Sequence, residues 1–317
     1  MPLWISIVLL GIVEGITEFL PISSTGHLLI AESWLDIDNN VLFKALNHGD
    51  LFNVVIQSGA VLAVLPLFPD RLRQFFFRWR EPATIDYLLK IFAAFALTCV
   101  GGFIMEKKHF KLPDTLRPVA LALFIGGVLF VIVESRLRDR QMGNYVTWPM
   151  AFAVGIGQLI AAGFPGASRS GTTILLALML GLNRVAATEF TFLVGIPTML
   201  AASALKIFKA FHHAGAGASG ENWKMLLLGF LVAAVVSFIA VKWLLRYVQT
   251  HTFIAFGWYR IALAAIILIL LLVPEKTPPP RAQRTDFNSH PDIFTVESLN
   301  PSHFPTMTTV SPTFAMG

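Results

Sequence analysis

Two apolar stretches of the chain are each interrupted by proline, glycine and hydroxyl residues, and each carries charged residues inside hydrophobic sequence. The first stretch reads EGITEFLPISSTGH from Glu14 to His27, and the second reads QLIAAGFPGASRSGTT from Gln158 to Thr173. Because charged groups inside an apolar segment are costly, they usually mark a binding site for a substrate or an ion. We expect the two stretches to fold toward each other and to build one site.

The composition predicts an integral membrane protein. Hydrophobic residues make up 55% of the chain and charged residues only 14%, with a mean hydropathy of +0.68, whereas a soluble domain averages about 25% charged residues. The net charge of +5 comes from basic residues in loops between apolar segments, which favours membrane topology over nucleic-acid binding. The single cysteine, Cys99, excludes an intramolecular disulfide and a cysteine-rich metal site.

Six apolar segments come close to the twenty or so residues that a membrane-spanning helix needs. They cover residues 51–69, 86–105, 117–134, 186–207, 224–246 and 253–273. Two further segments, 3–35 and 148–182, are broken at Pro21 and Pro165. Proline interrupts helix hydrogen bonding, and non-helical backbone at membrane depth must be buried in protein or line a wet cavity. We therefore predict that each broken segment is a re-entrant helix–loop–helix hairpin.

The two halves of the chain resemble each other. A shift of 144 residues places Glu14 on Gln158, Pro21 on Pro165 and Ser24 on Ser168. One hairpin plus three spans gives an odd number of crossings, so the halves, about 1–135 and 148–274, are predicted to form an inverted repeat. The predicted fold is an all-α polytopic membrane protein with a single domain at 1–274, followed by a disordered tail at 275–317 that is rich in Pro, Ser and Thr.

Glu14 and Glu18 are four residues apart, so on a helix they share one face. Two neighbouring carboxylates in apolar surroundings do not both ionise freely, and a cation or a shared proton would relieve their repulsion. The pair therefore predicts a divalent-cation site or an acid/base pair. The structural alternative is one protonated carboxyl group beside a carboxylate that serves a polar group of the core.

The first loop combines hydroxyl groups with one imidazole. Ser23, Ser24 and Thr25 lie at an expected helix N-terminus, where free backbone N–H groups favour an anion. His27 is the only titratable group of the loop that could act as a base or nucleophile near neutral pH. A purely structural histidine is the alternative.

The second loop adds a cation to the same pattern. Arg169 offers a planar fork of donors that suits phosphate, and Gly166 and Gly171 allow backbone to approach a ligand closely. Hydroxyl donors come from Ser168, Ser170, Thr172 and Thr173. The alternative is that Arg169 pairs with a glutamate of the first stretch and only holds the hairpins together. Gln57 and Glu189 occupy matched positions that could line the same cavity, although packing explains them equally well.

At this point the sequence resembles a known family. EGITEFLPISSTGH resembles the signature E/Q-GxxEFLPxSSTGH of the bacterial undecaprenyl-diphosphate phosphatases of the bacitracin-resistance (BacA) type, and PGASRSGTT resembles their second signature, PGxSRSGxT. The resemblance covers residues 3–273. It implies a multi-pass enzyme of the bacterial inner membrane that removes the terminal phosphate of the C55 isoprenyl diphosphate lipid. The product is the monophosphate carrier of peptidoglycan synthesis, and the activity confers bacitracin resistance.

The resemblance also implies residue roles and a cofactor. Glu14 and Glu18 match the acidic pair beside a divalent cation, Mg or Ca, while Ser24 and His27 match the loop that carries the chemistry, with Arg169 completing the catalytic set. Substrate binding is implied for Ser23, Thr25, Gly166, Ser168, Ser170, Gly171 and Thr173. Whether Ser24, His27 or water attacks phosphorus stays open, as does assembly into a homodimer.

A proton- or ion-coupled transporter or flippase of lipid phosphates is the rival interpretation. Inverted repeats with broken helices and charged groups near the midplane are typical of transporters. Glu14, Glu18 and His27 could relay protons in such a protein. The two functions are not exclusive, since a lipid phosphatase with this architecture could also move its product.

Overall fold

The computed structural model describes residues 2–35, 43, 51–108, 110, 115–138, 140–214 and 220–272. These residues form eleven α-helices, one 3₁₀ turn and an isolated bridge between Gly143 and Leu182, and they contain no strand. The prediction of an all-α fold is therefore confirmed for this part of the chain. The predicted disordered tail at 275–317 lies outside the described residues.

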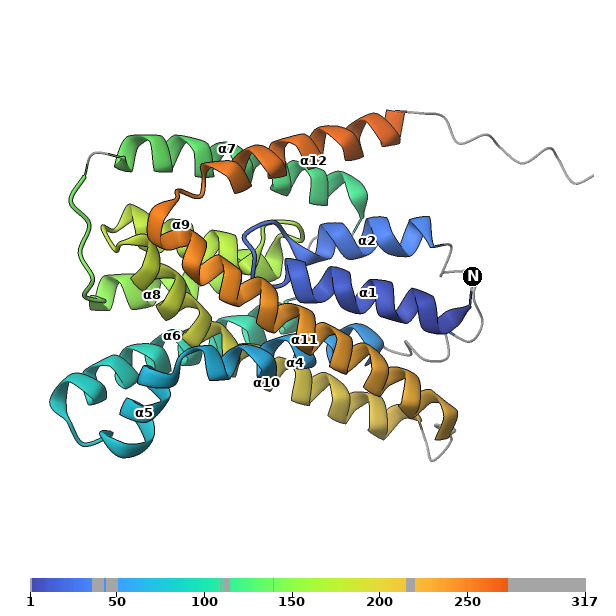
Figure 1. Ribbon diagram of the computed structural model, residues 1–317, viewed down its shortest axis with the longest axis horizontal. Helices are drawn as coiled ribbons and strands as arrows, with labels where there is room; N and C mark the ends of the chain where they lie inside the picture. The colour runs from blue at the N-terminus through green and yellow to red at the C-terminus, as the bar shows by residue number, and fades with distance from the viewer. Residues whose placement is uncertain are drawn as a thin grey trace, which may run out of the picture. The chain divides into compact units, whose positions relative to one another are not determined.

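The helices follow the predicted order (Figure 1). The first half contains α1 (Leu3–Thr17), α2 (Ser24–Trp34), α4 (Leu51–Val64), the 3₁₀ turn η3 (Leu65–Leu67), α5 (Pro69–Phe77), α6 (Pro82–Lys107) and α7 (Leu116–Leu137). The second half contains α8 (Trp148–Gly163), α9 (Arg169–Met179), α10 (Arg184–Ala214), α11 (Gly220–Thr250) and α12 (Ile254–Leu272). Both predicted breaks fall between helices, the first between α1 and α2 and the second between α8 and α9.

Four helices of the described part are long and apolar enough to cross a membrane: Pro82–Lys107, Leu116–Leu137, Arg184–Phe208 and Trp223–Thr250. A fifth candidate is Leu51–Leu67 together with Pro69–Phe77, although the two pieces are bent by 80° at Phe68. Proline at position 69 begins the second piece, which explains the bend because proline cannot continue the preceding helix hydrogen bonding. Six spans are predicted from the sequence, and for the sixth, α12, the structure gives only a shorter apolar helix, Ile254–Ile269.

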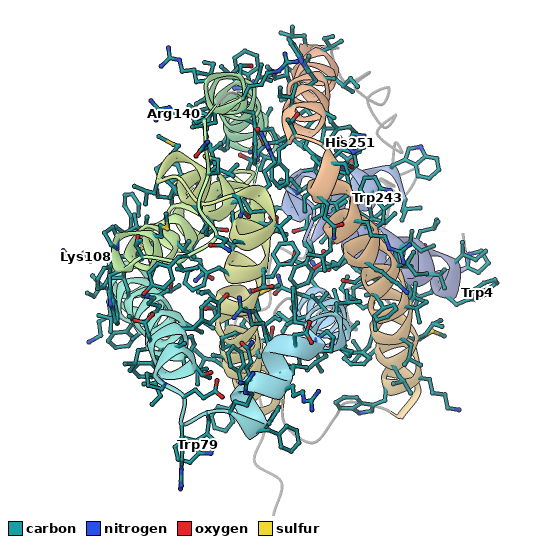
Figure 2. All side chains as sticks on the ribbon, turned by 60° about the vertical axis from the view of Figure 1, so that its left-hand side comes forward. Trp4, Trp79, Lys108, Arg140, Trp243 and His251 are labelled. Atoms are coloured by element: carbon teal, nitrogen blue, oxygen red, sulfur yellow. The ribbon has the colours of Figure 1, made fainter. Side chains whose placement is uncertain are left out.

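The outer surface of these helices is apolar. Only 17% of the apolar 18-residue stretch of α6 and 28% of that of α11 are buried. The side chains of Phe92 in α6 and Ile239 in α11 are 64% and 62% exposed. All seven tryptophans have exposed side chains, and Trp4 and Trp79 lie at the rim of the bundle in Figure 2. Exposed apolar helix faces with tryptophans near helix ends are the surface expected for a protein in a bilayer.

The two interrupted stretches meet inside the bundle, as predicted. α1 packs against α2 and α11, α8 packs against α6 and α9, and α10 contacts α4, α6 and α9. Phe19 and Leu20 of the first stretch share one buried cluster with Ile174 of α9 and Phe192 of α10. The rings of Phe19 and Phe192 meet edge to face with centroids 4.9 Å apart. This cluster fixes the first loop against the helices that follow the second loop.

The helices that follow the two loops begin in the same way. Ser23 caps α2 by accepting a hydrogen bond from the Gly26 N–H at 3.4 Å, and Ser168 caps α9 by accepting from the Gly171 N–H at 3.2 Å. Their φ angles are 77° and 65°, and no other non-glycine residue of the described part has a positive φ. Ser168 therefore corresponds to Ser23 rather than to Ser24, because the second loop has one more residue between its proline and its capping serine.

Candidate active site

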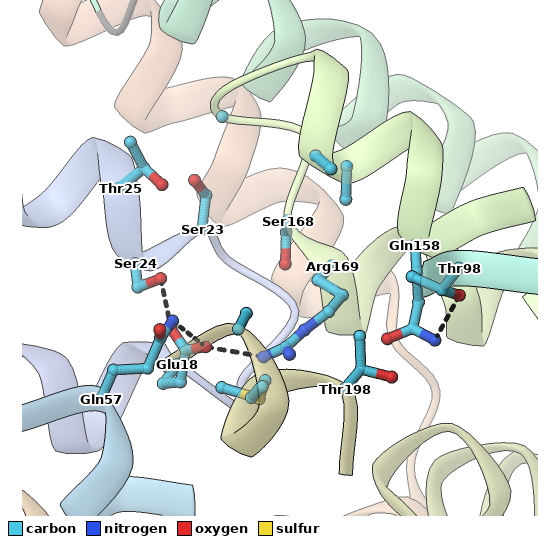
Figure 3. A pocket seen from close by; sticks show the side chains of 15 residues that line it. Glu18, Ser23, Ser24, Thr25, Gln57, Thr98, Gln158, Ser168, Arg169 and Thr198 are labelled. Carbon is cyan, nitrogen blue, oxygen red and sulfur yellow. Dashed lines mark hydrogen bonds and ion pairs between the residues drawn. The ribbon is translucent and has the colours of Figure 1, made fainter. Parts of the chain in front are cut away.

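A polar cavity of about 250 Å³ lies where the two loops meet (Figure 3). The loops contribute Glu18, Ser23, Ser24, Thr25, Gly166, Ser168 and Arg169 to its wall. The long helices contribute the polar side chains of Gln57, Thr98, Gln158 and Thr198. Ala161, Ala162, Met199 and Ala202 complete the wall, so the cavity combines polar and apolar side chains, whereas the outside of the same bundle is apolar.

Glu18 is the centre of the hydrogen-bond network in this cavity. Its Oε1 atom accepts from the Arg169 guanidinium at 2.7 Å and from the Gln57 amide at 3.0 Å, and its Oε2 atom accepts from the Ser24 hydroxyl at 2.6 Å. Figure 3 shows these three donors converging on the carboxylate. The side chain of Glu18 is only 3% exposed, so its charge is balanced by these contacts rather than by solvent. The carboxylate is also placed to accept a proton from the Ser24 hydroxyl.

Arg169 joins the two loops and also faces the cavity. Its ion pair with Glu18 is the holding contact considered as an alternative from the sequence. The Arg169 side chain nevertheless stays 21% exposed, and the residue lines the cavity wall. Because a guanidinium has five N–H donors, the contact with Glu18 leaves donors for a ligand. The geometry accommodates both interpretations of Arg169.

Two helix N-termini point their first turns at the same cavity. Ser24 and Thr25 begin α2, and Arg169 begins α9, and all three line the wall. The first N–H groups of a helix have no partner within the helix and carry partial positive charge, so they attract anions. Two such ends beside a guanidinium form a site for an anion with more than one charge.

The second loop is shaped by a proline–glycine turn. The Ala167 N–H donates to the Phe164 carbonyl at 3.1 Å, with Pro165 and Gly166 between them. Gly166 has a φ of 90°, which is the glycine position of a type II turn. A Cβ atom there would stand 2.6 Å from the Val119 carbonyl oxygen. Only glycine therefore fits at position 166, and the turn brings Ser168 and Arg169 to the cavity.

A second cavity of about 400 Å³ adjoins the first and shares Ser24, Thr25 and Gln57 with it. Its wall also contains Glu14, Glu32, Asn53 and Lys206. Within the described part of the chain, Glu14 Oε2 and Asn53 Oδ1 are buried and have no hydrogen-bond partner. Glu14 thus lies beside the polar cavity rather than in it, and it contributes an unsatisfied carboxylate oxygen.

His27 lines neither of these two cavities. Its Nδ1 atom lies 2.7 Å from the Ser23 carbonyl oxygen, and its Nε2 atom lies 2.7 Å from the Tyr259 hydroxyl. Since a carbonyl oxygen can only accept, Nδ1 carries the hydrogen and the Nε2 atom of a neutral ring accepts from Tyr259. The imidazole faces an apolar groove between α1, α2 and α12. The structure therefore does not bring His27 to the Ser24 hydroxyl.

Three predicted substrate-binding residues hold the loops instead of lining the cavity. The Ser170 hydroxyl donates to the Leu20 carbonyl at 3.1 Å, which joins the second loop to the first. The Thr173 hydroxyl donates to the Arg169 carbonyl at 2.8 Å. Gly171 donates the capping hydrogen bond to Ser168. The contacts of these residues are internal to the loops and to the start of α9.

Two polar residues of the cavity wall, Thr98 and Thr198, were not singled out from the sequence. Gln158 donates to the Thr98 hydroxyl at 3.1 Å, and its own oxygen is buried without a partner in the described part of the chain. Gln57 lines the cavity, as considered from the sequence. Glu189 instead pairs with Arg71 at 2.6 Å.

Tyr259 and Arg260 of α12 were also not singled out from the sequence. These residues contact the two loops but do not line the polar cavity. Arg260 is the only Asp, Glu, Lys or Arg between Arg246 and Glu275. An isolated charge in an apolar segment is the signal that drew attention to Arg169, so it could also have identified Arg260.

The chain is similar in sequence to known proteins. Residues 7–266 match the family model described as bacitracin resistance protein BacA. A Rhizobium etli protein named undecaprenyl-diphosphatase is 47% identical over 266 residues, which cover 84% of this chain and 96% of that protein. A Xanthomonas euvesicatoria pv. vesicatoria protein of the same name is 46% identical over 268 residues, which cover 84% of this chain and 97% of the relative. The matched region contains both loops and all the described helices that contact the cavity.

Proposed function

Because the chain belongs to the BacA family of bacitracin resistance proteins, we propose that it is an undecaprenyl-diphosphate phosphatase of the bacterial inner membrane. It removes the terminal phosphate of the lipid diphosphate, which recycles the carrier for peptidoglycan synthesis and confers bacitracin resistance. The observation that carries this proposal is the Ser24–Glu18–Arg169 network, in which a hydroxyl, a carboxylate and a guanidinium meet between two helix N-termini.

The size and polarity of the cavity fit the headgroup of such a lipid. A cavity of about 250 Å³ is smaller than the roughly 300–1,000 Å³ of sites that enclose whole small ligands. The diphosphate would occupy the polar cavity, and the isoprenyl chain would lie against the apolar surface in the bilayer. Arg169 and the first turns of α2 and α9 would hold the phosphate oxygens.

The chemistry we propose is centred on Ser24 and Glu18. Glu18 takes the hydroxyl proton as a bond forms between Ser24 Oγ and the terminal phosphorus, while the bond from phosphorus to the bridging oxygen breaks. The lipid monophosphate leaves, and water then releases inorganic phosphate from the serine. Direct attack by water, with Glu18 as the base, gives the same products in one step. In either route catalysis comes mainly from positioning and charge stabilisation.

The described residues fit a divalent cation, Mg²⁺ or Ca²⁺, beside this centre. Glu14 Oε2 and Asn53 Oδ1 are hard oxygen donors without partners in the described part of the chain, and both residues line the adjoining cavity. Glu18 fits the role less well than Glu14, because three protein donors already occupy its oxygens. No group of three His, Cys, Asp or Glu side chains suited to a metal exists among the described residues. Mg²⁺ is commonly held by one or two carboxylates together with waters and phosphates. When bound, the cation would offset phosphate charge.

Phosphate release from C55 and C15 isoprenyl diphosphates tests the function directly. We expect purified protein in detergent to release phosphate with Mg²⁺ or Ca²⁺ and to lose this activity in EDTA. Ser24→Ala should lower the rate if the serine is the nucleophile. Ser58→Ala is the matched control, because the Ser58 hydroxyl bonds to the Val54 carbonyl and does not line the polar cavity. Absence of release under any cation, combined with lipid movement in vesicles, would instead support the transporter.

We further propose that the α1–α2 and α8–α9 units are re-entrant hairpins of an inverted repeat within one domain. Their helices have 15, 11, 16 and 11 residues, which is short of the twenty or so needed to span a bilayer. The shared capping by Ser23 and Ser168, with its rare positive φ, supports a common origin of the two units.

Thiol labelling would test this topology. In a Cys99→Ser background, a membrane-impermeant thiol reagent should label Trp34→Cys from one side of the membrane and Met179→Cys from the other. Both residues lie near the ends of the second helices of their hairpins, and their side chains are exposed. Labelling of both positions from the same side would contradict the inverted arrangement.

A further inference from the structure

Arg260 of α12 is a fully buried cation that contacts both loops. Its side chain is 1% exposed. One guanidinium nitrogen donates to the carbonyls of Ala167 at 2.9 Å and Gly166 at 3.4 Å in the second loop, while the other donates to the Pro21 carbonyl of the first loop at 3.5 Å. A further contact reaches the Ala122 carbonyl of α7 at 3.4 Å. A single side chain thus joins the backbones of the two loops and α7.

The surroundings of Arg260 are suited to a guanidinium. In the described part of the chain it forms no ion pair, and its hydrogen-bond acceptors are backbone carbonyls. The guanidinium carbon lies 5.8 Å from the centre of the Phe130 ring. At Gly126 and Gly171 an added Cβ atom would clash with the guanidinium nitrogens. Because an unpaired buried charge is costly, its presence here indicates a role beyond packing.

Tyr259, the preceding residue, reaches the first loop through His27. The Tyr259 hydroxyl lies 2.7 Å from His27 Nε2, and the two rings are nearly parallel with centroids 5.7 Å apart. His27 in turn donates to the Ser23 carbonyl at 2.7 Å. Ser23 is the residue with positive φ that caps α2. Through His27 and Ser23, Tyr259 therefore restrains the position of the start of α2, where Ser24 lies.

We propose that Tyr259 and Arg260 are positioning residues that hold the two loops in register, an inference that rests on the proposed phosphatase function. Arg260 fixes the distance between Pro21 and the Gly166–Ala167 turn. Tyr259, through His27, fixes the capping residue Ser23. The attacking group and Glu18 come from the first loop, whereas Arg169 comes from the second. A shift of one loop against the other would therefore misalign the phosphorus with its nucleophile.

Substitution of Arg260 tests this role. We expect Arg260→Met, which keeps the length of the stem, to lower kcat by about 100-fold, the effect of a displacement of roughly 1 Å at a reacting centre. KM should change much less, because Arg169 and the helix N-termini remain. Arg260→Lys should recover part of the activity, since an ammonium can reach one loop but not span both. Unchanged kcat in Arg260→Met would overturn the proposal.

Lys90→Met is the matched control. Lys90 is also 1% exposed and bonded to Asp86 and Tyr145, but it does not line the polar cavity. We expect this variant to lose thermal stability and to keep the parent kcat. Equal loss of kcat in Lys90→Met and Arg260→Met would show a general effect of removing a buried cation and would also overturn the proposal.

Hydrogen exchange separates this inference from the phosphatase function, because it needs no substrate. Peptides that cover residues 18–26 and 164–172 should exchange faster in Arg260→Met than in the parent protein, and at the parent rate in Lys90→Met. Unchanged exchange in both loops would overturn the proposal even if activity fell. The parent protein could release phosphate from no isoprenyl diphosphate while the loops of Arg260→Met still exchange faster. That result would refute the phosphatase function but would retain the role of Arg260 in holding the two loops.

Tyr259→Phe provides a second variant if Arg260→Met fails to fold. Phenylalanine keeps the ring stacking on His27 and removes only the hydroxyl, so we expect a decrease in kcat of about tenfold, in the range of one lost hydrogen bond. Combined with His27→Phe, the effect should be less than additive, because both changes break the same contact. Full additivity, or no effect of Tyr259→Phe on kcat, would exclude Tyr259 as a positioning residue.

Discussion

Glu18→Gln is expected to lower kcat by about three orders of magnitude, with little change in the overall fold. Glutamine has nearly the same shape, so it can stay between Ser24, Gln57 and Arg169. It cannot take the proton from the attacking hydroxyl or water, and a positioned general base typically contributes about 10²–10⁴-fold. Single-turnover formation of the lipid monophosphate measures this step in both proposed routes, because the monophosphate leaves when the phosphorus is attacked.

A matched carboxylate distinguishes the chemical role of Glu18 from a loss of buried charge. Glu134 has a side chain that is only 1% exposed and forms an ion pair with an arginine, Arg184, at 2.6 Å, but it does not line the polar cavity. Glu134→Gln should therefore retain the parent kcat. Retention of kcat in Glu18→Gln would show that another group accepts the proton. Because His27 bonds to Tyr259 and to the Ser23 carbonyl and does not line the cavity, a second base would have to be a group other than His27.

The sequence predicted those parts of the site that follow from a residue and its neighbours in the sequence. Pro21 and Pro165 end helices because proline lacks the N–H group that a continuing helix needs, and both breaks lie between helices as predicted. Glu18 and Arg169 drew attention as charges in apolar sequence, and pairing of Arg169 with a glutamate of the first stretch was the alternative to phosphate binding. The structure places them 2.7 Å apart.

The parts that could not be predicted depend on which face of a helix meets which neighbour. His27 follows Ser24 by three residues on α2, yet Ser24 faces Glu18 and His27 faces Tyr259. Nothing in the loop sequence specifies that α12 packs beside the start of α2. The same reason explains why Thr173, which belongs to the second motif, bonds to backbone within α9 instead of facing the cavity.

The shift between the two halves shows a further limit of sequence comparison. Counting from Glu14 and Gln158 aligns Ser24 with Ser168, whereas the capping geometry aligns Ser23 with Ser168. The second loop has two residues between its proline and its cap, Gly166 and Ala167, where the first loop has only Ile22, so the register of the two caps differs from that of the two prolines. As a result, Ser24 and Arg169 occupy corresponding first positions of α2 and α9. One half thus supplies the hydroxyl and the other supplies the cation.

Replacing Arg169 with methionine is expected to abolish most activity, with a decrease in kcat of about 10³–10⁵-fold, the range found when an arginine that stabilises phosphoryl transfer is removed. Arg169→Lys should recover only part of this loss, because an ammonium cannot form the two parallel hydrogen bonds of a guanidinium with phosphate. Steady-state phosphate release measures both effects. Arg184→Met is the control, since Arg184 pairs with Glu134 at 2.6 Å and does not line the polar cavity.

Binding of a non-hydrolysable isoprenyl diphosphate analogue decides between the two roles of Arg169. If Arg169 binds phosphate, the folded Arg169→Met variant should bind the analogue with a clearly lower affinity than the parent protein. If Arg169 only holds the hairpins together, the folded variant should bind the analogue with the parent affinity. In Arg169→Met, the Glu18 carboxylate stays buried without its partner, which typically lowers the free energy of unfolding by about 3–5 kcal/mol. The affinities of the variant and the parent protein therefore need to be measured below the unfolding temperature of each. Retained affinity would remove Arg169 from the phosphate site and leave the helix N-termini as its main source of positive charge.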